Sequence, residues 1–122
     1  SQEVEKYNYN YLRDEKLNGR DCFMIEYDPV DPKSGYKRQL VWMDKAEYRV
    51  HKIDFYDRKD ALLKTLTYED YNQYLDKFWR PSRLVMINHQ TGKKTELVFA
   101  NWKLQTGMTE RDFEKSALKR SR

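Results

Sequence analysis

The sequence contains very little cysteine, glycine and proline, and each shortage excludes a class of protein. Its single cysteine, Cys22, cannot form an intrachain disulfide, so the chain is not a disulfide-stapled domain. The four glycines are isolated from one another and form no phosphate-binding loop. No apolar run is long enough to cross a membrane as a helix, and the chain does not start with a signal peptide. The cellular compartment therefore cannot be read from the termini.

The residue types that carry catalysis and metal binding are also sparse. His51 and His89 lie far apart and lack the spacing of metal ligands, so both are expected to be ordinary polar residues. Cys22 has no catalytic motif around it, and its place in an apolar strand is typical of a small core residue. Carboxylates such as those of Asp44 and Asp54 fit a surface of mixed charge. The sequence therefore predicts a protein that is not an enzyme and needs no metal or cofactor.

Composition predicts one folded domain over residues 1–122. Aromatic residues make up 15% of the chain, which argues against disorder, and charged residues make up 36%. The net charge of +4 comes from 24 basic and 20 acidic residues that are mixed within the same stretches. A phosphate-tracking groove would not be neutralised so evenly, so nucleic acid is not an expected partner.

The centre of the chain, from Tyr36 to Tyr68, has the pattern of an antiparallel meander. Runs of β-branched and aromatic residues alternate with charged four-residue breaks, as expected for strands joined by turns. The predicted strands and the turns between them are Arg38–Met43, Asp44–Glu47, Tyr48–Tyr56, Asp57–Asp60 and Leu62–Tyr68.

Alternation within this meander places apolar side chains on both faces of the sheet. Leu40 and Trp42 point to one face, whereas Val41 and Met43 point to the other. A sheet with one solvated face would carry polar residues on that face. We therefore expect the second face to be covered by a helix, a partner chain or an apolar ligand.

The flanking segments extend the same all-β pattern. The expected strands are Tyr7–Tyr11, Cys22–Tyr27, Trp79–Asn88 and Thr95–Leu104, with Glu69–Lys77 as an irregular connection. Helical spacing of apolar residues predicts a short C-terminal helix from Thr109. About seven antiparallel strands joined by sequential hairpins favour a curved sheet or a partial barrel.

The order of several strand and turn motifs resembles the outer-membrane lipoprotein-sorting (LolA-like) family. The motifs are Leu17-Asn18-Gly19-Arg20, Cys22-Phe23-Met24-Ile25-Glu26, Val41-Trp42-Met43-Asp44-Lys45 and Lys52-Ile53-Asp54-Phe55-Tyr56-Asp57, followed by Thr91-Gly92 and the ending Phe113 to Leu118. The resemblance covers most of the chain. It implies an incomplete β-barrel, lined with apolar side chains and closed by helices, in which periplasmic carriers hold lipoprotein acyl chains. The chain resembles only the C-terminal part of the domain, without the family's N-terminal helix and first strands.

The resemblance and the apolar pattern together predict a non-enzymatic periplasmic carrier of lipoproteins or lipids. Residues that could line its apolar trough are Met24, Trp42, Met43, Phe55, Val85 and Trp102. Plain core packing is the alternative for each of them. The alternative function is a protein–protein interaction domain that docks a membrane transporter or another partner through a sheet edge or an apolar face. An unpaired edge would also favour a homodimer.

Overall fold

A computed structural model describes residues 6–100 and 103–104 of the protein. These residues form eight β-strands and, within the described ranges, no helix. The chain divides into two compact units, Ser1–Leu63 and Lys64–Arg122, which we describe separately.

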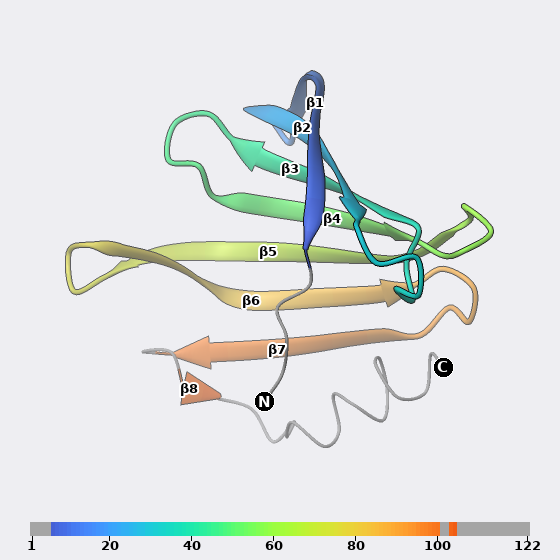
Figure 1. The fold of residues 1–122 in the computed structure, drawn as a ribbon. Coiled ribbons are helices and arrows are strands. Elements are labelled where there is room, and N and C mark those ends of the chain that lie inside the picture. Colours follow the sequence, from blue (N-terminus) through green and yellow to red (C-terminus); the bar gives the residue numbers. More distant parts are fainter. Residues whose placement is uncertain (1–5, 101–102, 105–122) are drawn as a thin grey trace. The chain divides into compact units, whose positions relative to one another are not determined.

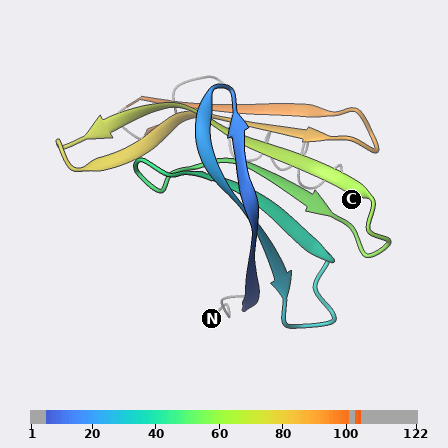
Figure 2. The same ribbon diagram turned by 90° about the horizontal axis from the view of Figure 1, so that it is seen from above.

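The first unit is an antiparallel meander of four strands in chain order. They are β1 (Tyr7–Leu17), β2 (Arg20–Pro29), β3 (Arg38–Asp44) and β4 (Val50–Tyr56). The direction of the strands turns steadily from β1 to β4 in both views (Figure 1, Figure 2), which is the ordinary twist of a β-sheet. The meander predicted from the sequence is confirmed here, except that β4 begins two residues late because Tyr48 adopts a left-handed backbone conformation with φ 57°.

The hairpin between β1 and β2 is tighter than predicted from the sequence. Asn18 and Gly19 have φ values of 51° and 81°, which are the conformations that a two-residue type I′ turn requires. Because the turn needs only these residues, β1 continues through the predicted break at Asp14 and ends at Leu17. A register shift between Tyr11 and Arg13 allows the longer strand to follow the twist of the hairpin.

The second unit contains β5 from Lys64 onward, together with β6, β7 and β8. The bounds of these strands are β5 (Leu62–Tyr74), β6 (Phe78–Asn88), β7 (Lys94–Ala100) and β8 (Lys103–Leu104). The prediction of an irregular connection over Glu69–Lys77 was wrong, since β5 runs to Tyr74 and pairs there with β6. The predicted single strand to Leu104 was also wrong, because β8 folds back and pairs antiparallel with β7. The helix predicted from Thr109 lies outside the described residues.

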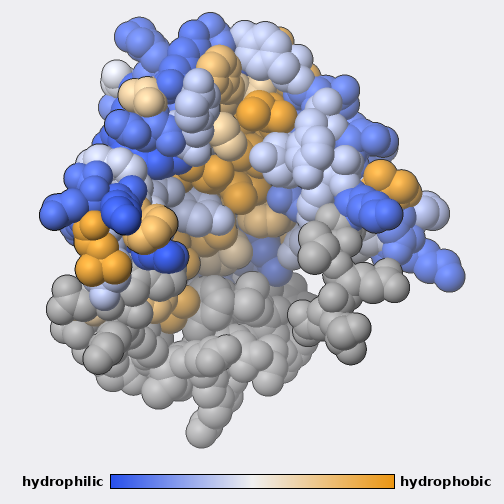
Figure 3. All heavy atoms as spheres, turned by 60° about the vertical axis from the view of Figure 1, so that its left-hand side comes forward, coloured by the Kyte–Doolittle hydropathy of each residue, from blue (hydrophilic) through white to orange (hydrophobic). Residues whose placement is uncertain are grey.

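Each unit buries its own set of side chains. In the first unit, Cys22, Met24, Leu40 and Trp42 form a cluster whose exposed fractions do not exceed 7%. Burial there raises the pKa of the Cys22 thiol, and the nearby Asp44 carboxylate raises it further, as expected for an inert core cysteine. The buried residues of the second unit include Val85, Met86, Asn88 and Thr95. Hydrophobic side chains also reach the surface between hydrophilic ones (Figure 3).

Candidate functional site

The strand register of the first unit sorts its apolar side chains onto two faces. We call the face that carries Cys22, Met24, Leu40 and Trp42 the tryptophan face. The opposite face, which we call the tyrosine face, carries Phe23, Ile25, Val41, Met43, Ile53 and Phe55, and it continues onto β1 and β2 as Tyr7, Tyr9, Tyr11 and Tyr27. The expectation of apolar residues on both faces is confirmed.

Charged side chains cover the tryptophan face. The indole Nε1 of Trp42 donates a hydrogen bond to Glu15 Oε1 at 3.0 Å, and this bond lowers the pKa of the Glu15 carboxyl. The Lys52 ammonium lies 4.5 Å from the centre of the Trp42 ring, a cation–π contact. The guanidinium of Arg38 covers the ring of Tyr56 at 4.0 Å in the same way. The apolar cluster on this face therefore lies beneath polar groups that are already paired with it.

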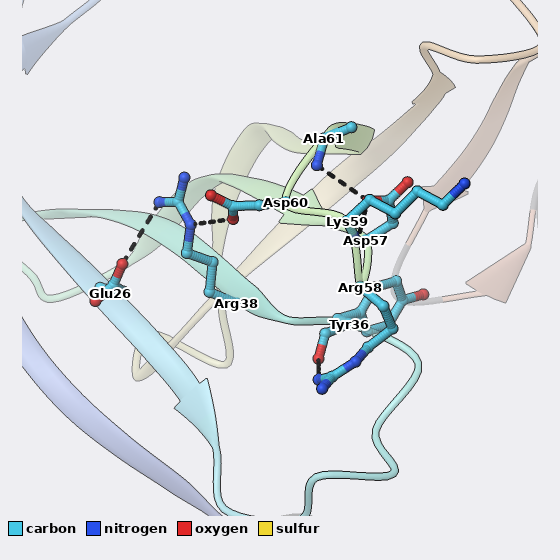
Figure 4. A network of polar contacts seen from close by, with 8 residues as sticks. All are labelled: Glu26, Tyr36, Arg38, Asp57, Arg58, Lys59, Asp60 and Ala61. Atoms are coloured by element: carbon cyan, nitrogen blue, oxygen red, sulfur yellow. Dashed lines mark hydrogen bonds and ion pairs between the residues drawn. The ribbon is translucent and has the colours of Figure 1, made fainter.

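Arg38 also links three segments of the first unit through its side chain (Figure 4). Its Nε donates to Asp60 Oδ1 at 2.8 Å in the turn after β4, and its second nitrogen lies 3.4 Å from Glu26 Oε2 on β2. The hydrogen bond to Asp60 raises the pKa of Arg38 and lowers that of Asp60. The turn itself is closed by Asp57, whose Oδ1 accepts the backbone N–H groups of Lys59 and Ala61. This network fixes the turn against the meander.

The tyrosine face is aromatic, and part of it is open to solvent. The ring of Tyr9 meets that of Tyr27 edge-on, with centroids 4.7 Å apart, and Tyr7 contacts the same ring at 5.7 Å. Tyr9 and Tyr11 remain 63% and 61% exposed. Further along the face, the rings of Phe55 and Tyr36 lie 5.0 Å apart. Tyrosine offers an apolar ring with a polar tip, so this face can contact apolar groups at a wet boundary.

The six residues predicted to line one trough do not share one surface. Met24 and Trp42 face each other across β2 and β3 and are 4% and 5% exposed on the tryptophan face. Met43 and Phe55 are half-buried on the opposite face. Val85 belongs to the second unit, and Trp102 lies outside the described residues. Tyr7, Tyr9 and Tyr11 were not among the residues predicted to line the trough, although their alternation in the sequence places the three tyrosines on one face of a strand.

Val85 lies on a face of the second unit that also carries an ion-pair network. It stands opposite Thr67 on β5 and Glu96 on β7. Arg83 bridges Glu96 at 2.8 Å and Glu69 at 3.5 Å on the same side of the strands. Val85 is therefore a buried residue beneath paired charges, an arrangement similar to that around Trp42.

A buried carboxylate at the end of β3 is the strongest electrostatic feature of the first unit. Asp44 is 3% exposed and accepts hydrogen bonds from the Glu47 N–H at 2.6 Å and from Arg49 Nε at 3.0 Å. His51 Nε2 lies 2.6 Å from its second oxygen. Burial alone would raise the pKa of Asp44, but these hydrogen bonds outweigh it and lower the pKa to about 2. The assignment of Asp44 to a surface of mixed charge was wrong.

Neither histidine is surrounded by metal ligands in the part of the chain that the structure describes. His51 is buried against Asp44, and His89 Nε2 lies 2.6 Å from the Thr65 hydroxyl. Within residues 6–100 and 103–104, no group of three or more His, Cys, Asp or Glu side chains is placed to hold a metal ion. The same residues include no helix of the length and hydrophobicity needed to cross a membrane.

Comparison with known proteins places the chain in a family. A family model described as an uncharacterized protein matches residues 1–120. The structure of a domain from Vibrio parahaemolyticus, titled as an outer membrane lipoprotein-sorting protein, shares 57% sequence identity with a TM-score of 0.77 over 94% of this chain. The chain belongs to the family that this model describes, and it is similar in sequence and fold to the lipoprotein-sorting domain. The family resemblance predicted from the sequence is thereby confirmed.

Two further solved structures show the same LolA-like fold. A DUF1329 family protein from Desulfovibrio piger has 27% identity and a TM-score of 0.75 over 89% of this chain. A LolA superfamily protein from Nitrosomonas europaea has 24% identity and a TM-score of 0.68 over 88%. The predicted fold class, a curved antiparallel sheet of the LolA type, is confirmed by these likenesses.

The chain spans about half the length of the solved proteins that it matches, with shares of 49%, 45% and 48%. No curated protein matches it in sequence.

Proposed function

We propose that this protein is a non-enzymatic periplasmic carrier that binds lipoprotein acyl chains or lipids against an apolar face of its sheet. The observation that carries this proposal is the 57% identity to a domain titled as an outer membrane lipoprotein-sorting protein. Apolar residues on both faces of the first unit support it, because a carrier needs one face for its core and another for its ligand.

The tyrosine face is the better candidate for the ligand. Cation–π contacts and a hydrogen bond already occupy the rings of the tryptophan face, and an acyl chain would have to displace Glu15 and Lys52 to reach Trp42. Met43 and Phe55 on the tyrosine face are half-buried without such a charged cover among the contacts of the described residues. Burial of an acyl chain contributes about 0.8 kcal/mol per CH₂ group, so few specific contacts are needed.

Substitution of one residue on each face tests this assignment. We expect a fluorescent fatty acid to bind the wild-type protein saturably and to bind Phe55→Gln about tenfold more weakly, because the polar side chain removes apolar contact area. The control Lys52→Gln, on the opposite face of the same strand, should bind as the wild type does. Circular dichroism and melting curves check that both variants fold. Unchanged affinity in Phe55→Gln, or a loss confined to Lys52→Gln, would contradict the tyrosine face as the binding surface.

The second candidate function is a protein–protein interaction domain, and the observation that favours it is the edge strand β1. Within the described residues, β1 pairs with β2 alone, and eight of its eleven residues are exposed. Its second half carries the four charged residues Arg13–Lys16, which discourage pairing, whereas Tyr7–Leu12 carries none. A membrane transporter or a second copy could add a strand there. A dimer in sedimentation experiments, together with no lipid binding, would favour this alternative.

A further inference from the structure

The hairpin between β5 and β6 ends in large apolar side chains that the fold leaves in solvent. We call residues Tyr74–Arg80 the hairpin tip. Leu75 is 70% exposed, Phe78 is 51% exposed and Trp79 is 38% exposed. Among the described residues of the second unit, these three are the exposed large hydrophobic residues. All three lie within five consecutive positions of the chain. Scattered exposed apolar residues need no explanation, but a cluster of this kind marks an interaction site.

The backbone of the turn is unfavourable for the residue that occupies it. Leu75 and Asp76 have φ values of 53° and 54°, and the N–H of Lys77 donates to the Tyr74 carbonyl at 3.1 Å. This is a type I′ turn, which favours Asn or Gly at its first central position. A leucine there is strained, and its side chain is also largely exposed to water. Neither property stabilises the fold, so both point to a role outside it.

The apolar side chains lie on both sides of the hairpin. Phe78 stands opposite Tyr74, and Trp79 stands opposite Gln73, so the two neighbouring aromatic residues face opposite ways. Pairing of β7 with β6 runs from Arg83 to Ile87 among the described residues, and the hairpin extends beyond it (Figure 1). A flat protein surface could cover only one side of such a tip. A lipid layer surrounds an inserted tip on every side, and Trp and Tyr favour its interface.

Basic residues lie beside the apolar ones. Lys77 and Arg80 outnumber Asp76, the acidic residue within the hairpin tip. The Arg80 guanidinium lies 6.0 Å from the centre of the Phe78 ring, next to a depression that Tyr74 and Arg80 help to line. Cationic groups at the base of an apolar tip complement anionic lipid headgroups.

We propose that the hairpin tip is a membrane-docking site, which inserts Leu75, Phe78 and Trp79 into a lipid surface while Lys77 and Arg80 contact anionic headgroups. The site goes beyond the carrier function, because docking requires only the tip and not an acyl chain on the tyrosine face. It would bring the protein to the lipid surface from which, or to which, a cargo moves.

Sedimentation with vesicles tests the proposal. We expect the protein to bind vesicles of phosphatidylcholine mixed with phosphatidylglycerol more tightly than vesicles of phosphatidylcholine alone. Leu75→Asn should weaken binding to the mixed vesicles about tenfold, since it removes an inserted apolar side chain. Asparagine suits the left-handed turn, so this variant should melt at the same temperature as the wild type or higher. Lys77→Gln should weaken binding to the mixed vesicles about fivefold and leave binding to the neutral ones unchanged.

The matched control is Val30→Asn, which removes an apolar residue that is 55% exposed in a loop of the first unit. It should bind mixed vesicles as the wild type does. Failure of the wild type to bind mixed vesicles, equal binding to neutral vesicles, or wild-type binding by Leu75→Asn would each overturn the proposal. Saturable binding of fatty acid by Leu75→Asn in vesicle-free buffer would show that the carrier function stands independently of this result.

Discussion

At the scale of single residues, the paired groups around Asp44 matter most for stability. The chain places this carboxylate at the end of β3, where it accepts a backbone N–H and two side-chain donors while it is 3% exposed. The sequence could not reveal this, because a turn that contains Asp44, Lys45 and Glu47 has the composition of a solvated loop. The donor His51 lies on β4 and the donor Arg49 directly precedes that strand, so only the pairing of β3 with β4 brings them to Asp44.

The pKa of Asp44 predicts how stability depends on pH. Folding lowers this pKa from 3.8 to about 2, so the stabilisation is complete above about pH 4 and is lost as the pH falls towards 2. The shift corresponds to about 2 kcal/mol, because one pKa unit is about 1.4 kcal/mol. Urea titrations should therefore show Asp44→Asn less stable than the wild type by about that much at pH 7. The difference should shrink between about pH 4 and pH 2.

The control for this measurement is Asp31→Asn, which removes a carboxylate from an exposed loop. Its difference from the wild type should stay within about 0.5 kcal/mol. A difference between Asp44→Asn and the wild type that stays constant down to pH 2 would mean that the folded protein does not hold this carboxylate in its charged form.

At the scale of strands and turns, the sequence predicted most of the elements and misplaced several of their ends. The alternation of residue types was sufficient to predict β2, β3 and β6, because these strands contain β-branched and aromatic residues, which favour a sheet. It failed for Glu69–Tyr74, because Glu, Asp, Asn and Gln are rare in strands. Pairing with Phe78–Arg83 overrides that local preference. The odd or even position of a residue along its strand predicted the face to which its side chain points. Position alone did not show which of the two faces is covered by charged side chains.

The β1–β2 turn tests whether a positive φ makes glycine necessary at a position. Gly19 has a φ of 81°, so Gly19→Ala should lower the free energy of unfolding by about 1 kcal/mol even though open space surrounds the position. Gly35 also has open space around it but does not have a positive φ, so Gly35→Ala should be neutral or stabilising by up to about 1 kcal/mol. Chemical denaturation of the two variants gives the comparison. Equal effects of the two substitutions would show that φ does not decide the outcome.

At the scale of the whole molecule, the family could be predicted from the order of its motifs, but a single apolar trough could not. The chain matches its family model over residues 1–120 and shares its fold with three solved proteins, each about twice its length. The six predicted trough residues are apolar, but apolar character does not distinguish a core position from a ligand-binding position. The structure separates Met24 and Trp42 from Met43 and Phe55, and it adds a tyrosine face as the candidate surface.

Co-elution with an acylated peptide is the decisive experiment for the proposed binding of acyl chains. A triacylated lipopeptide and the same peptide without its acyl chains would each be mixed with the protein and passed through gel filtration in buffer free of detergent. We predict that the triacylated peptide elutes with the folded protein in a stoichiometric complex and that the deacylated peptide elutes alone, since apolar burial supplies the affinity. Co-elution of both peptides to the same extent, or of neither, would contradict the account.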